Sequence, residues 1–196
     1  SGNGTLTAGS IVDYSVLNNT LLISQGGGTT RHSTTGTSFS DTSGAPAGPA
    51  VEQYLNRIFV AGTSGTMSYS VTGDPTNWAA TGTSDGGVVT IPGAGLPNKL
   101  FKLNNRLNIS KTVGGMYYWD GFNLVDRSLD LGPSSALSYS KIEDSGIWAN
   151  RLGLFNSFGD QPTLISNPIQ RQFYNDAGSG IIGANFGTMP AIAHRY

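Results

Sequence analysis

A five-residue pattern occurs four times along the chain and constrains the fold more than any other feature. It consists of Asn, then Thr or Arg, then Leu or Ile, then any residue, then an aliphatic residue. The copies begin at Asn19, Asn56, Asn105 and Asn150 and are spaced by 37, 49 and 45 residues. Regular self-similarity of this kind indicates a repeat architecture.

Each copy predicts a turn followed by a strand. Asn tolerates the left-handed backbone conformation of tight turns. The third and fifth residues of a copy project to the same side of a strand, and they are aliphatic in all four copies, so this side is predicted to be buried. Further strand candidates precede each copy and follow most of them: Ile11–Val16, Val51–Leu55, Lys99–Leu103 and Gly146–Ala149 before, and Gly65–Val71, Val88–Ile91 and Gly114–Asp120 after.

Three or four short strands in every 40–50 residues are typical of a β-propeller blade. One more step of about 44 residues from Asn150 reaches His194-Arg195-Tyr196, where Thr5–Thr7 could complete a last blade. We therefore expect a single all-β domain over residues 1–196, a β-propeller of about five small blades, with a fragment of a larger propeller as the alternative.

The composition supports strands and turns rather than helices. Gly, Ser, Thr and Asn make up 84 of the 196 residues, whereas only 12% are charged, too few for solvated helix faces. The stretch 29–48 is rich in Gly, Ser and Thr and is expected to be a flexible loop. There is no cysteine, no signal peptide is visible, and no apolar run approaches the length of a membrane span.

The residues that carry chemistry are sparse, so we expect no enzymatic activity, no metal and no cofactor. The two histidines, His32 and His194, lack the spacing of metal ligands. Asp74, Asp85, Asp120 and Asp160 stand beside Pro, Gly or Gln-Pro, where a turn role explains an aspartate. Gly26-Gly27-Gly28 lacks the Lys-Ser/Thr ending of a phosphate-binding loop.

Two sets of residues are candidates for binding. Arg57, Arg106 and Arg151 follow the repeated Asn and could face phosphates or acidic loops; pairing with a nearby carboxylate is the plainer interpretation. Tyr117 and Trp119 share one strand face and could stack on a sugar or base, or could pack between blades. Core packing is also expected for Trp78 and Trp148.

The stretch over residues 50–172 resembles the propeller proteins of bacteriophage tails and necks. The resemblance rests on Asn56–Gly62, Ser68-Tyr69-Ser70 and Gly73–Trp78, then Lys99–Leu107, Ser110-Lys111 and Met116–Gly121, then Ser134-Ser135, Gly146-Ile147-Trp148 and Leu164–Gln170. This protein family includes the nozzle proteins of short-tailed phages and related packaged-DNA stabilisation proteins.

This resemblance implies a virion structural protein that acts as a rigid assembly platform in the phage tail or neck. Its implied partners are other virion proteins and copies of itself, close to the phage DNA, and the family carries no catalytic residues to transfer. The alternative hypothesis is a carbohydrate-binding propeller that recognises a receptor glycan. A glycoside hydrolase would need two inward carboxylates at a suitable separation, and the sequence identifies no such pair.

Overall fold

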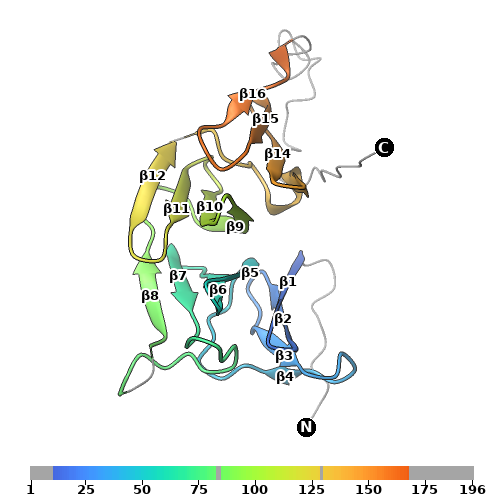
Figure 1. Cartoon of the computed structure of the whole chain (residues 1–196), viewed down its shortest axis with the longest axis vertical. Helices are drawn as coiled ribbons and strands as arrows, with labels where there is room; N and C mark the ends of the chain where they lie inside the picture. The colour runs from blue at the N-terminus through green and yellow to red at the C-terminus, as the bar shows by residue number, and fades with distance from the viewer. Residues whose placement is uncertain (1–10, 83–84, 129, 168–196) are drawn as a thin grey trace. The chain divides into compact units, whose positions relative to one another are not determined.

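The computed structural model describes residues 11–82, 85–128 and 130–167. These residues form four four-stranded sheets, and within each sheet the strands lie side by side in chain order (Figure 1). The first sheet holds β1 (Val12–Leu17), β2 (Thr20–Gln25), β3 (Arg31–Ser33) and β4 (Ser40–Asp41); the second β5 (Ala50–Tyr54), β6 (Arg57–Ala61), β7 (Thr66–Tyr69) and β8 (Gly87–Thr90); the third β9 (Pro97–Leu103), β10 (Arg106–Lys111), β11 (Met116–Trp119) and β12 (Leu124–Ser128); the fourth β13 (Tyr139–Ile142), β14 (Ser145–Asn150), β15 (Gly153–Ser157) and β16 (Thr163–Leu164).

The predicted all-β class is therefore confirmed, with η1 (Ala136–Ser138) as the one helical turn named among the described elements. The predicted loop 29–48 contains the short strands β3 and β4. The count of five blades stays a prediction, because Thr5–Thr7 and His194-Arg195-Tyr196 lie outside the described residues.

The turn predicted at the repeated Asn is confirmed in the first three sheets. It joins the first two strands, and both of its central residues have positive φ: 47° and 61° at Asn18 and Asn19, and 47° and 53° at Asn104 and Asn105. In the second sheet Leu55 has a φ of 45° before Asn56 at 56°. Two successive left-handed residues define the type I′ turn, whose twist matches that of the strands it joins.

In the fourth copy the predicted turn and the strand that follows it are present, at residues 151–152 and in β15, but Asn150 is not left-handed. Asn150 ends β14 and does not precede the second strand of its sheet; Asp144 holds that position, directly after Glu143, which has a φ of 53°. The Asn150 side chain instead accepts a hydrogen bond from the Leu152 backbone N–H at 2.7 Å. The pattern matched here because Asn also builds turns through its side chain.

The backbone contacts divide the chain into two compact units, residues 1–100 and 101–196. In each unit two successive sheets pack face to face. Within a unit, we call the face by which the earlier sheet packs on the later one its front face, and the face of the later sheet that receives it the back face; the remaining face of each sheet takes the other name.

In the first unit, the front face of the first sheet packs on the back face of the second. Leu17 and Leu22 form one buried cluster with residues of β5 and β6, and Trp78 packs against it; the β5 and β6 residues are Val51, Ile58 and Val60. The third and fifth residues of the second copy, Ile58 and Val60, are thus buried as predicted. The prediction was wrong for the first copy, in which the fourth residue, Leu22, is fully buried while Leu21 and Ile23 are half-buried.

In the second unit, the third and fourth sheets meet in the same manner. The cluster contains Phe101, Leu103 and Met116 from the third sheet and Trp148 and Phe155 from the fourth. Trp148 is fully buried and donates its indole N–H to the Leu131 carbonyl at 2.7 Å. The core roles predicted for Trp78 and Trp148 are confirmed.

A polar contact accompanies the apolar joint of the first unit. Asp13 on β1 accepts a hydrogen bond from the Val51 backbone N–H at 3.2 Å. Both of its carboxylate oxygens also lie 2.9 Å from the Lys99 ammonium. One carboxylate thus holds strand β5 beside β1 and neutralises a lysine in the same unit.

The left-handed Leu55 lowers the stability of its turn in the second sheet. Leu55 holds a positive φ that costs roughly 1–2 kcal/mol for a residue other than Gly, Asn or Asp, and its side chain is 48% exposed. Leu55→Asn, which copies the residue of the first and third sheets, is expected to raise the free energy of unfolding by about 0.5–1 kcal/mol in urea titrations. The control Leu96→Asn removes an equally exposed leucine without positive φ, and an equal gain there would contradict the explanation.

Candidate functional site

Arg57 joins β6 to the segment that precedes β8. Its guanidinium donates to the backbone carbonyls of Ser70 at 3.0 Å and Asp85 at 2.6 Å, and it also forms an ion pair with the Asp85 carboxylate. The same guanidinium lies 5.1 Å from the ring centroid of Tyr69. The pairing with a nearby carboxylate that the sequence offered as one interpretation is the arrangement found.

Asp85 accepts further hydrogen bonds from Thr72. The Thr72 backbone N–H donates at 2.9 Å and its hydroxyl at 2.7 Å. These bonds, followed by the Arg57 guanidinium, favour the ionised carboxyl and lower the pKa of Asp85 to about 2. Asp85 thus fastens the loop that starts at Thr72 to the second sheet.

Arg106 occupies the position in the third sheet that Arg57 occupies in the second. Its guanidinium lies 4.6 Å from the ring centroid of Tyr118, and Arg127 approaches the same ring at 5.8 Å. Arg127 is nearly buried and donates to the Asn108 side-chain oxygen at 2.6 Å. Burial is the main cause that lowers the pKa of Arg127, and the charge of Arg106 adds to it.

The two arginines hold one loop of the fourth sheet. The Gly159 carbonyl accepts hydrogen bonds from Arg127 and, at 3.5 Å, from Arg106, whose guanidinium lies 3.9 Å from the Asp160 carboxylate. A Cβ atom added to Gly159 would stand 2.1 Å from that of Asn104. Loop 158–160 is therefore fixed tightly against the β9–β10 turn.

This fixed loop presents Phe158, whose side chain is 64% exposed. It lines a hollow of about 400 Å³ that we call the Phe158 pocket, together with Lys102, Asn104, Asn105, Lys141 and Asp144. The lining comes from the β9–β10 turn, the β13–β14 hairpin and the end of β15. An apolar ring beside two lysines, two amides and one carboxylate is suited to a partner segment that combines an apolar side chain with acidic or polar groups.

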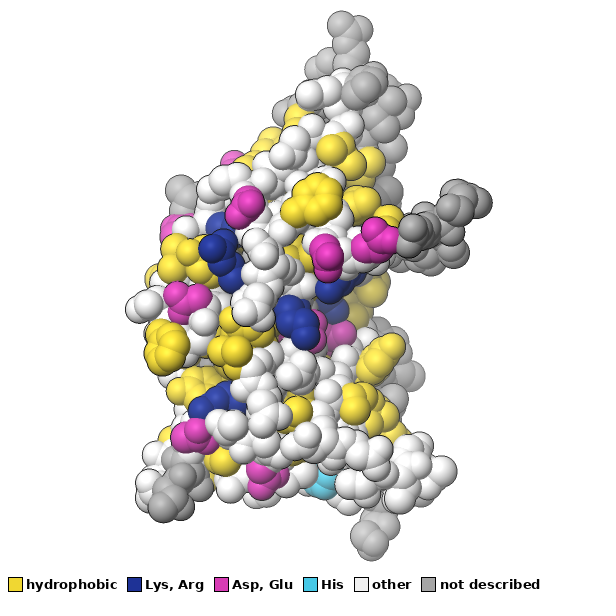
Figure 2. All heavy atoms as spheres, in the orientation of Figure 1, with side chains coloured by type: hydrophobic (Ala, Val, Ile, Leu, Met, Phe, Trp, Pro, Cys, Tyr) yellow, Lys and Arg dark blue, Asp and Glu magenta, His cyan; other side chains and the backbone are white. Residues whose placement is uncertain are grey.

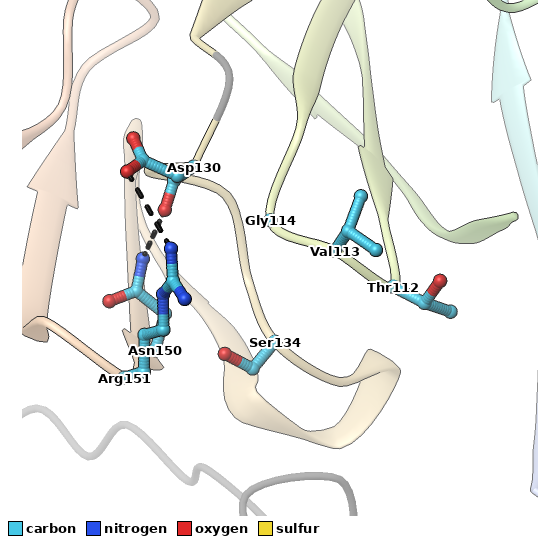
Figure 3. A pocket seen from close by; sticks show the side chains of 7 residues that line it. All are labelled: Thr112, Val113, Gly114, Asp130, Ser134, Asn150 and Arg151. Atoms are coloured by element: carbon cyan, nitrogen blue, oxygen red, sulfur yellow. Dashed lines mark hydrogen bonds and ion pairs between the residues drawn. The ribbon is translucent and has the colours of Figure 1, made fainter. Parts of the chain in front are cut away.

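A second hollow, the Arg151 pocket, lies at the opposite end of these two sheets, since strand direction alternates. It encloses about 240 Å³ and is lined by Thr112, Val113, Gly114, Asp130, Ser134, Asn150 and Arg151. Figure 3 shows the Arg151 guanidinium directed at the Asp130 carboxylate, which it approaches to 3.9 Å. Asn150 donates to the Asp130 and Gly132 carbonyls, so its side chain ties the turn after β14 to segment 130–132 in the wall of the pocket.

The aromatic candidates of β11 face inward to different degrees. Tyr117 is 5% exposed and pairs in register with Ile109, whereas Trp119 is half-buried opposite Leu107. The ammonium of buried Lys111 lies 5.8 Å from the Tyr117 ring centroid, and burial lowers the pKa of this lysine. Tyr117 consequently presents no open ring face to a ligand.

Several of the turn aspartates act as the sequence predicted. Asp74 accepts from the Thr76 backbone N–H at 2.9 Å, and Asp120 accepts from the Phe122 and Asn123 backbone N–H groups at 2.8 Å. The bond from Asn123 is the largest cause that lowers the pKa of Asp120. His32 shares a hydrogen bond with the Thr42 hydroxyl at 3.0 Å, and His194 lies outside the described residues.

Among residues 11–82, 85–128 and 130–167, no three His, Asp or Glu side chains gather as metal ligands would. The same part of the chain includes no helix with the length and hydrophobicity needed to cross a bilayer. Figure 2 shows hydrophobic side chains in separate patches, set among uncharged polar surface and a few charged groups. The surface shown therefore offers apolar contacts with little charge to desolvate.

No protein-family model and no curated protein sequence matches the chain. Several solved structures do match the fold of the chain. YCF48 from Cyanidioschyzon merolae aligns with a TM-score of 0.54 at 15% identity over 81% of this chain and 57% of its own. YCF48 bound to D1 peptide aligns with a TM-score of 0.55 at 12% identity over 82% and 57%.

BBS1N in complex with ARL6DN aligns with a TM-score of 0.51 at 15% identity over 85% of this chain and 59% of its own. All these neighbours are β-propellers. The fold of this chain is a β-propeller fold. The chain spans less than 60% of the length of these propellers, and at such low identity the likeness concerns the fold alone.

The sequence patterns did not identify Arg127, Lys111 or Phe158 as residues of the site. They belong to no repeated pattern, and a lone Arg, Lys or Phe in a β-rich stretch is ordinarily a surface or core residue. The one available signal in the sequence was Gly159, between Phe158 and Asp160. Glycine is required where another part of the chain comes close to the backbone.

The bonds of Asp85 generate a prediction about pH. Because its pKa is lowered in the folded state, Asp85 contributes stability that is complete above its ordinary pKa of 3.8 and is lost as the pH falls towards about 2. Asp85→Asn is therefore expected to be less stable than the parent at neutral pH, and the difference should shrink between about pH 4 and pH 2.

NMR titration of the Asp85 carboxyl carbon measures the same effect directly. The variant Thr72→Val keeps the backbone donor but loses the hydroxyl, so its midpoint should move upward. An Asp85 that titrates at its ordinary value in the parent would show that these bonds do not form in solution.

Proposed function

We propose that this chain is a rigid docking platform for other proteins, without enzymatic activity, and that it serves as a structural component of a phage tail or neck. The observation that carries the platform is the Phe158 pocket, in which an exposed aromatic side chain is held by a loop that two arginines clamp. A pre-organised aromatic anchor of this kind lowers the entropic cost of binding a partner.

The solved neighbours support a protein partner. One is YCF48 bound to D1 peptide, and another is BBS1N in complex with ARL6DN. Propellers present turns at both ends of stiff sheets, and the Phe158 pocket lies in such a set of turns. The virion location is supported by the resemblance of residues 50–172 to phage tail and neck propellers.

A glycan-binding role receives less support. Sugar recognition by stacking needs an aromatic ring open to solvent, and Tyr117 is buried against Ile109 and Lys111. Phe158 is an open ring, but two lysines flank it in the pocket. These charged neighbours of Phe158 suit a peptide segment with acidic and apolar side chains better than a neutral sugar.

Site-specific photo-crosslinking tests the proposal. With a photoreactive phenylalanine at position 158, infected cells should yield one defined adduct with another polypeptide, and Lys102→Glu with Lys141→Glu should reduce its yield several-fold. The matched control carries the probe at Phe122, which is 87% exposed and outside the pocket.

Equal background adducts at positions 158 and 122 would contradict docking at the pocket. An adduct with a tail or neck protein, in a chain that sediments with virions, would support the whole proposal. An adduct with a protein that is absent from virions would leave the platform standing and refute the virion location.

A further inference from the structure

Strand β1 has two faces of very different exposure. On the front face, Ser15 and Leu17 are buried at the joint with the second sheet. On the back face, Val12, Tyr14 and Val16 are 41%, 70% and 54% exposed. Since side chains alternate along a strand, these three form one continuous apolar strip.

The paired strand β2 extends this strip. In the antiparallel register, Tyr14 lies opposite Ile23 and Val16 opposite Leu21, so all four side chains share the back face. Leu21 and Ile23 are half-buried. The back face of the first sheet is thus apolar over these four side chains, with Gln25 opposite Val12, and β1 is also an edge strand of the sheet.

The repeat shows what covers this face elsewhere in the chain. Counted from the type I′ turn, Tyr14 corresponds to Val51 in the second sheet and Leu100 in the third, which are 2% and 0% exposed. Likewise Leu21 and Ile23 correspond to Ile58 and Val60, both fully buried.

In the second sheet these equivalent residues are covered by the front face of another sheet. Val51, Ile58 and Val60 pack on Leu17 and Leu22. The back face of the first sheet therefore has the composition of a sheet-to-sheet joint, and within residues 11–82 and 85–100 no described sheet packs on it. Exposed apolar faces of this kind mark association sites.

The fourth sheet carries the other half of such a joint. Its back face is occupied, because Trp148 and Phe155 lie in the core with Phe101 and Leu103. By strand alternation, Ile147 and Leu154 point to the front, and both are half-buried. Ile165, which follows the core residue Leu164, is 46% exposed.

We propose that the back face of the first sheet binds the front face of the fourth sheet of a second copy of this chain. The contact repeats the front-to-back joint that the chain already makes within each unit. It is heterologous, so it gives a ring if the rotation closes and a longer assembly if it does not. This inference does not depend on the proposed docking function.

Light scattering coupled to size-exclusion chromatography of the full chain tests the inference. The parent and the control Phe122→Asp should have a mass of two or more chains. Tyr14→Asp and Ile165→Asp should each be monomeric, because each loses one half of the joint. An equimolar mixture of these two variants should recover a dimer through the one joint that stays intact.

Val16→Asp is a second variant of the back face, and circular dichroism checks that all variants keep the parent's fold. A monomeric parent would overturn the inference, as would folded Tyr14→Asp and Val16→Asp variants that still associate. If Ile165→Asp still associates with itself while Tyr14→Asp is monomeric, the contact is back-to-back. This result would equally overturn the inference.

Discussion

Front-to-back packing between successive sheets is the interaction on which the rest of this structure depends. A small isolated sheet buries too little apolar surface to be stable alone, and with 12% charged residues the chain has few ion pairs to compensate. The joint between the first two sheets buries Leu17, Leu22 and the aliphatic residues of β5 and β6, and the joint of the second unit buries Trp148 and Phe155. Because these joints fix the sheets, the turns at their ends become rigid enough to hold a binding surface.

The repeated Asn predicted most of the fold because a type I′ turn restricts its residues strongly. Two left-handed positions select Asn in the first and third sheets, and the strands on both sides follow from the alternation of apolar residues. In the fourth sheet the copy still marks a turn before a strand, but its Asn is not left-handed. Asn150 stabilises its turn through its side chain, whereas Glu143 adopts the left-handed conformation with no signal in the sequence.

The candidate site could be predicted only in part, because it depends on contacts between residues far apart in sequence. Arg57 and Arg106 were found through the repeat, but their tyrosine partners and the loop held by Arg106 follow from the fold. Arg127 and Phe158 stand outside the repeat, and Arg127 binds the loop of Phe158 through the Gly159 carbonyl. Similarly, the strip of Val12, Tyr14 and Val16 resembles an ordinary strand in the sequence; only its exposure, set against buried Val51, distinguishes it.

A double-mutant cycle across the first joint tests the central role of this packing most directly. Leu22→Ala and Val60→Ala remove side chains from the two sheets that face each other in one cluster. If the sheets stabilise one another, the free energies of unfolding should be non-additive by roughly 1 kcal/mol, while Leu22→Ala and Met116→Ala, from separate clusters, should add. Additivity of Leu22 and Val60 within about 0.3 kcal/mol would contradict the account.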